Sequence, residues 1–258
     1  MKKTIGISAW KGDAGKHLAR RAIHLIDKQG VDAWIWIVRR VNDCTDKMLE
    51  WVAENSSVQV GLIVESWEAP EDRLVRCSLV GDVAINAAIM RGAERVLIHE
   101  SDLISPDDVV PRLAAVLDGG ERRAVAGGWP CLASVGMDES LDLYGGAMRL
   151  GRHMQLHVEG QKPAEPFFYD TWGYRHEGVR FASVPPYSPC YRPDEPFRLD
   201  TVGSVALIDA RYLHLGARME HEGFVNLCGR VREQGGEIWC DPRITINQPL
   251  ELWTFQDN

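Results

Sequence analysis

Short apolar runs alternate with helical stretches through the first 116 residues, and this alternation constrains the fold more than any other feature of the chain. The apolar runs have the length of single strands, whereas the stretches between them carry apolar residues at helical spacing. Such an alternation is typical of a mostly parallel sheet covered by helices. We expect strands at Ile5–Ala9, Trp34–Val38, Val58–Val64 and Val96–His99, and helices at His17–Lys28, Asp46–Glu54 and Leu79–Arg91.

Residues 119–258 follow a less regular pattern. Ala124–Ala126 predicts a short strand that ends at Gly127-Gly128, and the periodicity then fades between Arg149 and Arg198. That segment holds nine of the 21 aromatic residues, which favours a binding wall, with a hydrophobic β-ribbon beneath a loop as the alternative. Beyond it we expect strands at Val202–Ile208, Glu237–Cys240 and Arg243–Ile246, a helix that starts at Ala210, and a helix at Phe224–Gln234.

Composition limits the classes of protein to which the chain can belong. With 258 residues, 45% of them hydrophobic, it is long enough for one α/β domain over 1–258, with halves at 1–118 and 119–258. A net charge of -8 disfavours non-specific attraction to nucleic acid or to anionic membranes. We expect a cytoplasmic protein, because neither a signal-peptide core nor a membrane-spanning run is present in the sequence. Its 6 cysteines lack metal-ligand spacing, which argues against structural zinc.

Two carboxylates follow the apolar strand at Val96–His99. Side chains two residues apart in an extended chain point to the same side, so Glu100 and Asp102 can converge on one point. Mg²⁺ and Mn²⁺ prefer oxygen ligands and are commonly held by one or two carboxylates together with substrate phosphates. The pair therefore predicts a metal site for a diphosphate-bearing substrate. The alternative is a solvated turn before a helix that Ser105 caps and Pro106 begins.

The ends of the first two expected strands carry further candidates. Trp10 and Lys11 follow the first strand, where open α/β sheets usually contact a ligand. The following stretch, 11–17, is not a Walker A loop, because only two residues separate its glycines and a histidine follows its second lysine. Asp43 and Asp46 follow the second strand and are expected to accept hydrogen bonds from a nucleobase, although Asp43 would also serve as a helix N-cap.

The order of these motifs resembles a known family. The turn at 43–46, the stretch Gly81 to Asn86, and Val96–Asp102 with Ser105-Pro106 look like the nucleotide-binding half of GT-A glycosyltransferases, including family-2-like members. Further along, Tyr169–Trp172, Thr201–Ile208 and Glu220–Phe224 are similar in order and spacing to fungal mannan-polymerase-type mannosyltransferases.

The resemblance implies a GT-A fold, with a mixed, mostly parallel sheet in a single domain. It implies a metal-dependent glycosyltransferase that moves a sugar from a UDP- or GDP-sugar to an acceptor hydroxyl. Residues 1–118 would bind the nucleotide sugar and 119–258 the acceptor. Mn²⁺ or Mg²⁺ would be held by Glu100 and Asp102, with Asp102 counted as catalytic. Asn247 stands near the place where many relatives have a late metal-binding histidine.

Residues of the second half are assigned to the acceptor. Glu222, and less favourably Glu220, could take the proton from the attacking hydroxyl in an inverting transfer, while a charged helix start is the alternative. Trp172, Tyr174 and Arg175 are expected to form the acceptor wall. A hydroxymethylated DNA base, a soluble glycan and a protein all remain open as acceptors. A sugar-phosphate nucleotidyltransferase and a non-catalytic nucleotide-binding protein are the competing functions.

Overall fold

The computed structural model describes residues 2–10, 24–38, 50, 52–68, 70–101, 103–133, 167–168, 173–180 and 194–249. The strands in this part of the chain are β1 (Thr4–Trp10), β2 (Ala33–Val38), β3 (Gln59–Val64), β4 (Arg95–His99), β5 (Arg123–Ala133), β6 (Phe167–Phe168), β7 (Arg175–His176), β8 (Val179–Arg180), β9 (Phe197–Leu199), β10 (Val205–Asp209) and β11 (Glu237–Pro249). The helices are α3 (Arg73–Met90), α4 (Val109–Asp118), α6 (Ala210–His214) and α7 (Phe224–Glu233). Residues 24–26 and 52–55 are also helical.

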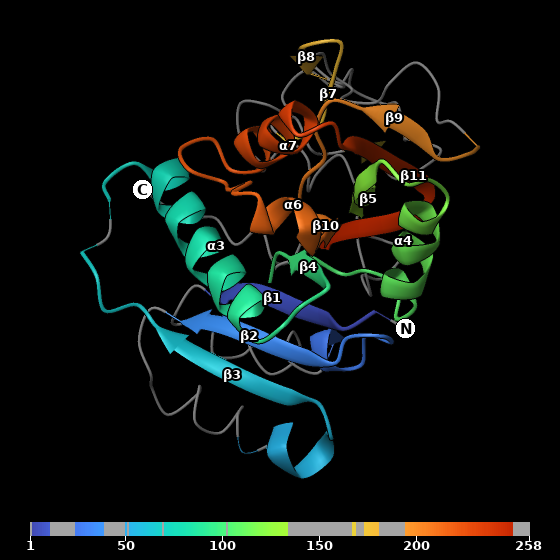
Figure 1. Ribbon diagram of the computed structural model, residues 1–258. Helices are drawn as coiled ribbons and strands as arrows, with labels where there is room; N and C mark the ends of the chain where they lie inside the picture. Colours follow the sequence, from blue (N-terminus) through green and yellow to red (C-terminus); the bar gives the residue numbers. More distant parts are fainter. Residues whose placement is uncertain are drawn as a thin grey trace, which may run out of the picture.

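The described strands form one nine-stranded sheet, with β7 and β8 as a separate ribbon (Figure 1). Its order is β3-β2-β1-β4-β10-β5-β11-β9, and β6 pairs with β5. Pairing is parallel from β3 through β4 and between β5 and β11, whereas β10 runs antiparallel between β4 and β5. The predicted fold class, a mixed and mostly parallel sheet flanked by helices, is confirmed.

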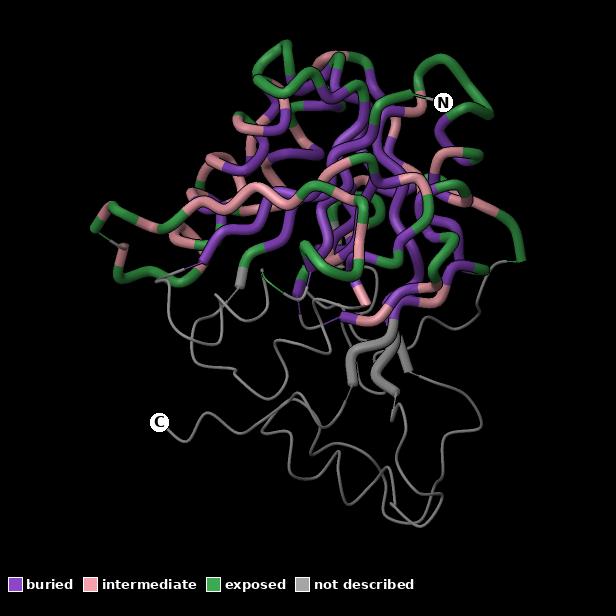
Figure 2. The backbone as a smooth tube through the Cα atoms, turned by 90° about the horizontal axis from the view of Figure 1, so that it is seen from below, coloured by how far each residue is buried: buried purple, intermediate pink, exposed green. Residues whose placement is uncertain are grey.

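Helices cover both faces of the sheet. One core contains α3, α6 and α7 side chains packed on Ile5, Ile7 and Ile98. The other contains α4 side chains packed on Trp34 and Leu97. Figure 2 shows the buried stretches of the backbone gathered through the middle of the described part, with exposed stretches around them. The two cores explain why the strands of the first half are apolar at nearly every position.

A glycine makes room for one large buried ring on the neighbouring strand. Trp34 and Trp36 are both fully buried on β2, and Gly6 on β1 pairs with Trp34. A Cβ atom at Gly6 would lie 2.5 Å from two ring atoms of Trp34, so the ring occupies the space that a side chain at residue 6 would need. The position therefore requires glycine for packing.

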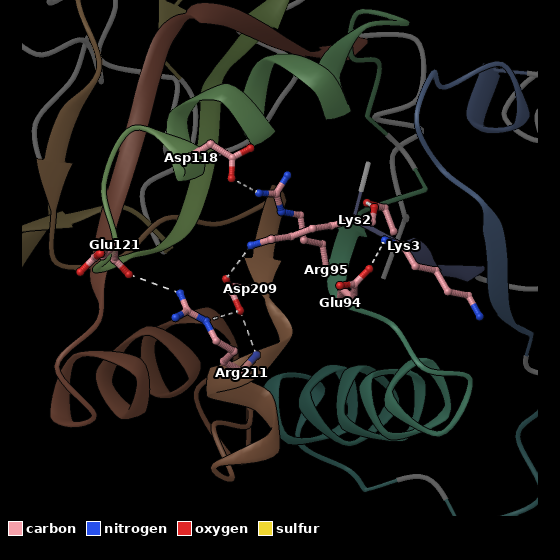
Figure 3. A network of polar contacts seen from close by, with 9 residues as sticks. Lys2, Lys3, Glu94, Arg95, Asp118, Glu121, Asp209 and Arg211 are labelled. Atoms are coloured by element: carbon pink, nitrogen blue, oxygen red, sulfur yellow. Dashed lines mark hydrogen bonds and ion pairs between the residues drawn. The ribbon is translucent and has the colours of Figure 1, made fainter.

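Charged side chains connect the strands at the edge where β1 and β4 begin (Figure 3). Lys2 Nζ lies 3.5 Å from Asp209 Oδ2, and Arg211 Nε lies 3.0 Å from Asp209 Oδ1. Arg95 pairs with Asp118 beside them. Burial acts to raise the pKa of the Asp209 carboxyl, but hydrogen bonds from Arg211 and the charges of Arg211 and Lys2 outweigh it and hold that pKa below its usual range. This edge is stabilised by ion pairs, and it lies opposite the carboxyl ends of the parallel strands.

Several expected boundaries differ from the structure. The α3 helix starts at Arg73, six residues before the expected start, because Asp72 Oδ1 accepts hydrogen bonds from the backbone N–H groups of Leu74 and Val75 at 2.8 and 2.9 Å. Strand β5 continues past Gly127-Gly128 to Ala133. Strand β10 starts at Val205 and not at Val202.

The expected pair of closing strands is one strand. Strand β11 is continuous over Glu237–Pro249, and its pairing with β5 shifts register between Cys240 and Thr245. Pro242 lies inside that shift, where the ladder does not need its missing N–H group. In the described part of the chain, no helix is both long enough and apolar enough to cross a membrane.

Candidate functional site

The carboxyl ends of β1, β2 and β4 lie at one edge of the sheet, because these strands are parallel. Ligands of open α/β sheets bind outside this edge. Glu100 follows β4 at this edge and is exposed. Its backbone N–H donates to the carbonyl oxygen of Ser204 at 3.1 Å. The backbone of Glu100 is thus attached to the residue that precedes β10, while Glu100 itself is exposed.

Beneath this turn lies a buried polar network that the sequence did not predict. His99 Nδ1 lies 2.8 Å from the Glu100 carbonyl oxygen, and His99 Nε2 lies 2.8 Å from Ser105 Oγ. The backbone N–H of Ser105 donates to His24 Nε2 at 3.1 Å, and Lys28 Nζ donates to the Ser105 carbonyl oxygen at 2.6 Å. Both sides of the turn at 100–104 are therefore held by the same group of side chains.

Burial sets the charge state of the two histidines. Desolvation lowers the pKa of His99 to about 3 and that of His24 to about 4, so both rings are neutral near pH 7. A neutral His99 can donate from Nδ1 to the Glu100 carbonyl and accept the Ser105 hydroxyl proton at Nε2, which satisfies both ring nitrogens. Burial also lowers the pKa of Lys28, which Asp107 opposes by a 3.1 Å ion pair.

Ser105 does not cap the following helix, contrary to the sequence-based alternative. It is buried, and α4 starts at Val109 after Asp108, which makes no side-chain cap hydrogen bond. Ser105 therefore contributes to the network beneath the turn. The polar His99 at the end of an otherwise apolar strand is the signal in the sequence that indicates such a network.

Most of the predicted donor-side residues lie outside the described residues or are described by backbone alone. Lys11, Asp43, Asp46 and Asp102 are outside, as is Trp172 of the predicted acceptor wall. Trp10 ends β1, and Asn247 lies in β11 with Cys131 as its partner on β5. Strands β10 and β5 lie between β4 and β11 in the order of the sheet. Within the described residues, no three His, Cys, Asp or Glu residues gather into a possible metal site.

Tyr174 is not part of an exposed acceptor wall. Its ring is fully buried in the hydrophobic core, and its hydroxyl donates to the carbonyl oxygens of Gly128 and Gly203 at 2.6 and 3.3 Å. The aromatic ring is buried because it bridges β5 and the segment before β10. Arg175 follows in β7, is half-buried, and its backbone pairs with Thr201.

The structure distinguishes the two candidate bases. Glu220 is half-buried, and its carboxylate forms an ion pair with Arg230 at 3.5 Å. Glu222 is exposed, one residue before Gly223 at the start of α7, and its carboxylate makes no ion pair or hydrogen bond within the described chain. Of the two, Glu222 is therefore the carboxylate that makes no polar contact within the described residues.

Comparisons with solved structures identify the fold. GalNAc-T7, in a crystal structure with UDP, GalNAc and Mn²⁺, matches with a TM-score of 0.59 and 12% identity over 96% of this chain and 44% of its own. The mannosyltransferase PcManGT from Pyrobaculum calidifontis, in complex with GDP-Man and Mn²⁺, matches with a TM-score of 0.54 and 10% identity over 95% of this chain and 56% of its own. S. aureus TarS 1–349, in complex with UDP-GlcNAc, matches with a TM-score of 0.54 and 12% identity over 96% of this chain and 58% of its own.

These likenesses show that the chain has the GT-A fold. The chain spans only about half the length of these structures, 44 to 58%. No protein-family model and no curated protein sequence matches it.

Proposed function

We propose that this chain is a glycosyltransferase that moves a sugar from a UDP- or GDP-sugar to an acceptor hydroxyl. The observation that carries the proposal is the exposed Glu100 directly after the central parallel strand β4 of a GT-A fold, on a turn that buried side chains hold in place. The solved structures of similar fold hold UDP, GDP-Man or UDP-GlcNAc, which supports a nucleotide-sugar donor and leaves its base and sugar open.

A divalent cation suits the chemistry of the acidic turn. Glu100 offers carboxylate oxygens at the strand end, and Asp102 follows two residues later in the sequence. Carboxylate oxygens are suitable ligands for Mn²⁺ and Mg²⁺, and Asn247 is proposed as a third, weaker ligand. When bound, the cation would neutralise the nucleoside diphosphate as it leaves. The chain's own contribution is the network of His99 and Ser105, which fixes the turn before a donor arrives.

The remaining roles follow the order of the chain. We assign the donor to residues 1–118, where Trp10 and Lys11 would line the nucleotide pocket and Asp43 with Asp46 would bind the base. We assign the acceptor to residues 119–258. Glu222 would take the proton from the attacking hydroxyl if the transfer inverts the anomeric configuration. In a retaining transfer no base is needed at that position.

Trp172 and Arg175 remain proposed contacts of the acceptor, and Tyr174 is withdrawn. The acceptor itself is proposed to be a hydroxymethylated DNA base, a soluble glycan or a protein. A thermal-shift screen with each acceptor class, followed by product analysis by mass spectrometry, would discriminate among them. Transfer to none of the three classes, despite donor turnover, would contradict this part of the proposal.

The proposed donor site is tested by a thermal-shift screen of nucleotide sugars with and without Mn²⁺. We expect one donor to raise the melting temperature of the wild type more in the presence of Mn²⁺ than in its absence. Glu100→Gln should lose the Mn²⁺-dependent part, because it removes a ligand charge. Glu121→Gln is the matched control, since Glu121 is an exposed carboxylate at the opposite edge of the sheet. An equal Mn²⁺ effect in the wild type and Glu100→Gln would contradict the metal assignment.

Turnover distinguishes the transferase from its competitors. Release of UDP or GDP from the donor supports the transferase, exchange of pyrophosphate into the donor would support a nucleotidyltransferase, and donor binding without any turnover would support a non-catalytic protein. Glu222→Gln should reduce kcat by about 10²-fold or more with donor affinity little changed, as expected for a general base. Near-normal turnover in this variant would indicate a retaining mechanism or another base.

A further inference from the structure

One face of α3 holds the chain segment that precedes α7. Ser78, Asp82 and Asn86 are spaced four residues apart and so form one stripe along the helix. The segment 218–223 runs along this stripe antiparallel to α3 and makes a contact with it at each helical turn. In Figure 1 the connection between α6 and α7 lies beside the first turns of α3.

Each residue of the stripe binds a different part of the segment. Asn86 Oδ1 accepts hydrogen bonds from Arg218 Nε and one terminal guanidinium nitrogen at 3.1 and 2.6 Å. Asp82 uses both carboxylate oxygens, accepting from the backbone N–H of Met219 at 2.7 Å and of Glu220 at 3.0 Å. The third contact, made by Ser78, is nearest the edge of the sheet at which the parallel strands end.

There, the backbone N–H of Gly223 donates to Ser78 Oγ at 3.0 Å, and the Ser78 hydroxyl in turn donates to the Leu74 carbonyl at 2.8 Å. Ser78 is fully buried, so its hydroxyl has a fixed set of partners. Gly81 lies against this segment: a Cβ atom there would lie 2.3 Å from Met219 Sδ, so the Met219 side chain would have to shift.

The segment is held in an unfavourable backbone conformation. Glu220 has a φ of 49° and Gly223 a φ of 60°, and the first of these lies in a region that residues other than glycine rarely adopt. Such a conformation persists only where surrounding contacts impose it, and it is concentrated at functional sites. Here the contacts from Asp82 and Ser78 lie on either side of Glu222.

Glu222 itself is fixed through its neighbours and not through its side chain. Glu220 is bound at its N–H group and Gly223 at its N–H group, whereas the Glu222 carboxylate is exposed and makes no polar contact within the described residues. The strained backbone at Glu220 and the two N–H contacts thus lie within two residues of the exposed Glu222 carboxylate.

We infer that Asp82 and Ser78 are positioning residues, which set the location of the Glu222 carboxylate through the backbone of 219–223. This inference rests on the proposed function for the role of Glu222, whereas the clamp itself is independent of it. Displacing a reacting group by about 1 Å can cost about 100-fold in rate, so the clamp should affect turnover more than donor binding.

The first experiment measures amide hydrogen exchange and needs no substrate. In Asp82→Asn, one of the two N–H groups loses its acceptor, so the amide of Met219 or that of Glu220 should exchange faster than in the wild type. Ser78→Ala should do the same for Gly223, and it serves as the second variant if Asp82→Asn does not fold. Unchanged exchange at these amides in a folded variant would overturn the clamp.

The second experiment is a double-mutant cycle in kcat at saturating donor and acceptor. Asp82→Asn should reduce kcat by about 10- to 100-fold in the wild-type background, with the donor Kd unchanged. In the Glu222→Gln background it should change kcat less than about 2-fold, because it acts through the carboxylate that is already absent. Equal losses in the two backgrounds would show a merely structural role and overturn the inference.

Stability is separated from positioning by a control outside the segment. Asp118→Asn weakens the ion pair with Arg95 at the opposite edge, so it should lower the melting temperature without lowering kcat. If the wild type shows no turnover with any donor and acceptor, the proposed function fails and the positioning role fails with it, even where hydrogen exchange demonstrates the clamp. If the wild type turns over but the losses in kcat from Asp82→Asn and Glu222→Gln are additive, the proposed function stands and this inference alone is overturned.

Discussion

The burial of Tyr174 makes a prediction that separates a core residue from an acceptor contact. Tyr174→Phe keeps the ring and removes only the hydroxyl, so the core retains its packing. The carbonyl oxygens of Gly128 and Gly203 then lose the O–H donor that lies 2.6 and 3.3 Å from them. Gly128 keeps a long contact from the Cys240 thiol at 3.4 Å. The variant should therefore be less stable and equally active.

The expected loss follows from the cost of an unsatisfied buried polar group. That cost is about 1–3 kcal/mol, and because the second bond is long we expect about 1–2 kcal/mol. For a chain of this size, 1 kcal/mol shifts the melting temperature by about 2–4 °C. Tyr174→Phe should thus melt about 2–8 °C below the wild type.

Thermal and urea unfolding of Tyr174→Phe, with Tyr212→Phe beside it, provide the measurement. Tyr212 is also buried, at 8% exposure, but its hydroxyl has no hydrogen-bond partner within the described residues, so its loss should cost little. The KM for the acceptor should not change in either variant. A Tyr174→Phe variant with normal stability and a raised acceptor KM would refute the burial argument and restore Tyr174 to the acceptor wall.

Two further predictions concern stability. Gly6→Ala should lower the free energy of unfolding by about 1–3 kcal/mol through overpacking, because its Cβ would lie 2.5 Å from the buried Trp34 ring. Gly229→Ala, at a position of α7 with nothing within 4 Å, should raise the free energy of unfolding by about 0.5–1 kcal/mol. The urea midpoints of the two variants check both predictions. The pKa of His24 is about 4 in the folded protein, against 6.5 for a solvated histidine, so the unfolded chain binds a proton that the folded one does not as the pH falls below 6.5. Stability should fall by about 2 kcal/mol per such group between pH 7 and 5, and the slope should be smaller in His24→Gln; an equal slope in both proteins would argue against a neutral buried His24.

Particular elements show why some boundaries are predictable and others are not. Strands β1, β2 and β4 lie where the apolar runs predict them, because a strand covered on both faces must be apolar throughout. The edge strand β3 also lies at its predicted place, although its residues are half-buried or exposed. The predicted end of β5 is wrong because Gly127-Gly128 is typical of a turn. These glycines instead make room for neighbours, since Cβ atoms there would lie 2.9 Å from Val202 and 2.7 Å from Ile246.

The acidic turn after β4 is predictable from the sequence, but its support is not. Strand length and the spacing of Glu100 and Asp102 are local properties, whereas the network beneath the turn joins His24 to Ser105 across 81 residues. Local sequence favours a helix-cap role for Ser105. Burial beside His99 gives it a different set of hydrogen-bond partners.

Residue spacing and apolar periodicity suffice to specify the class of fold, the strand-end placement of Glu100, and the position of Glu222 just before a helix, because all three are local properties of the chain. The order of the strands, with β10 antiparallel between β4 and β5, and the burial of Tyr174 emerge only when the whole sheet is assembled. The same holds for Asp82 against Glu220, 138 residues apart. Pairings over such separations depend on which surfaces meet when the two halves of the sheet pack, and no local pattern of residues specifies that.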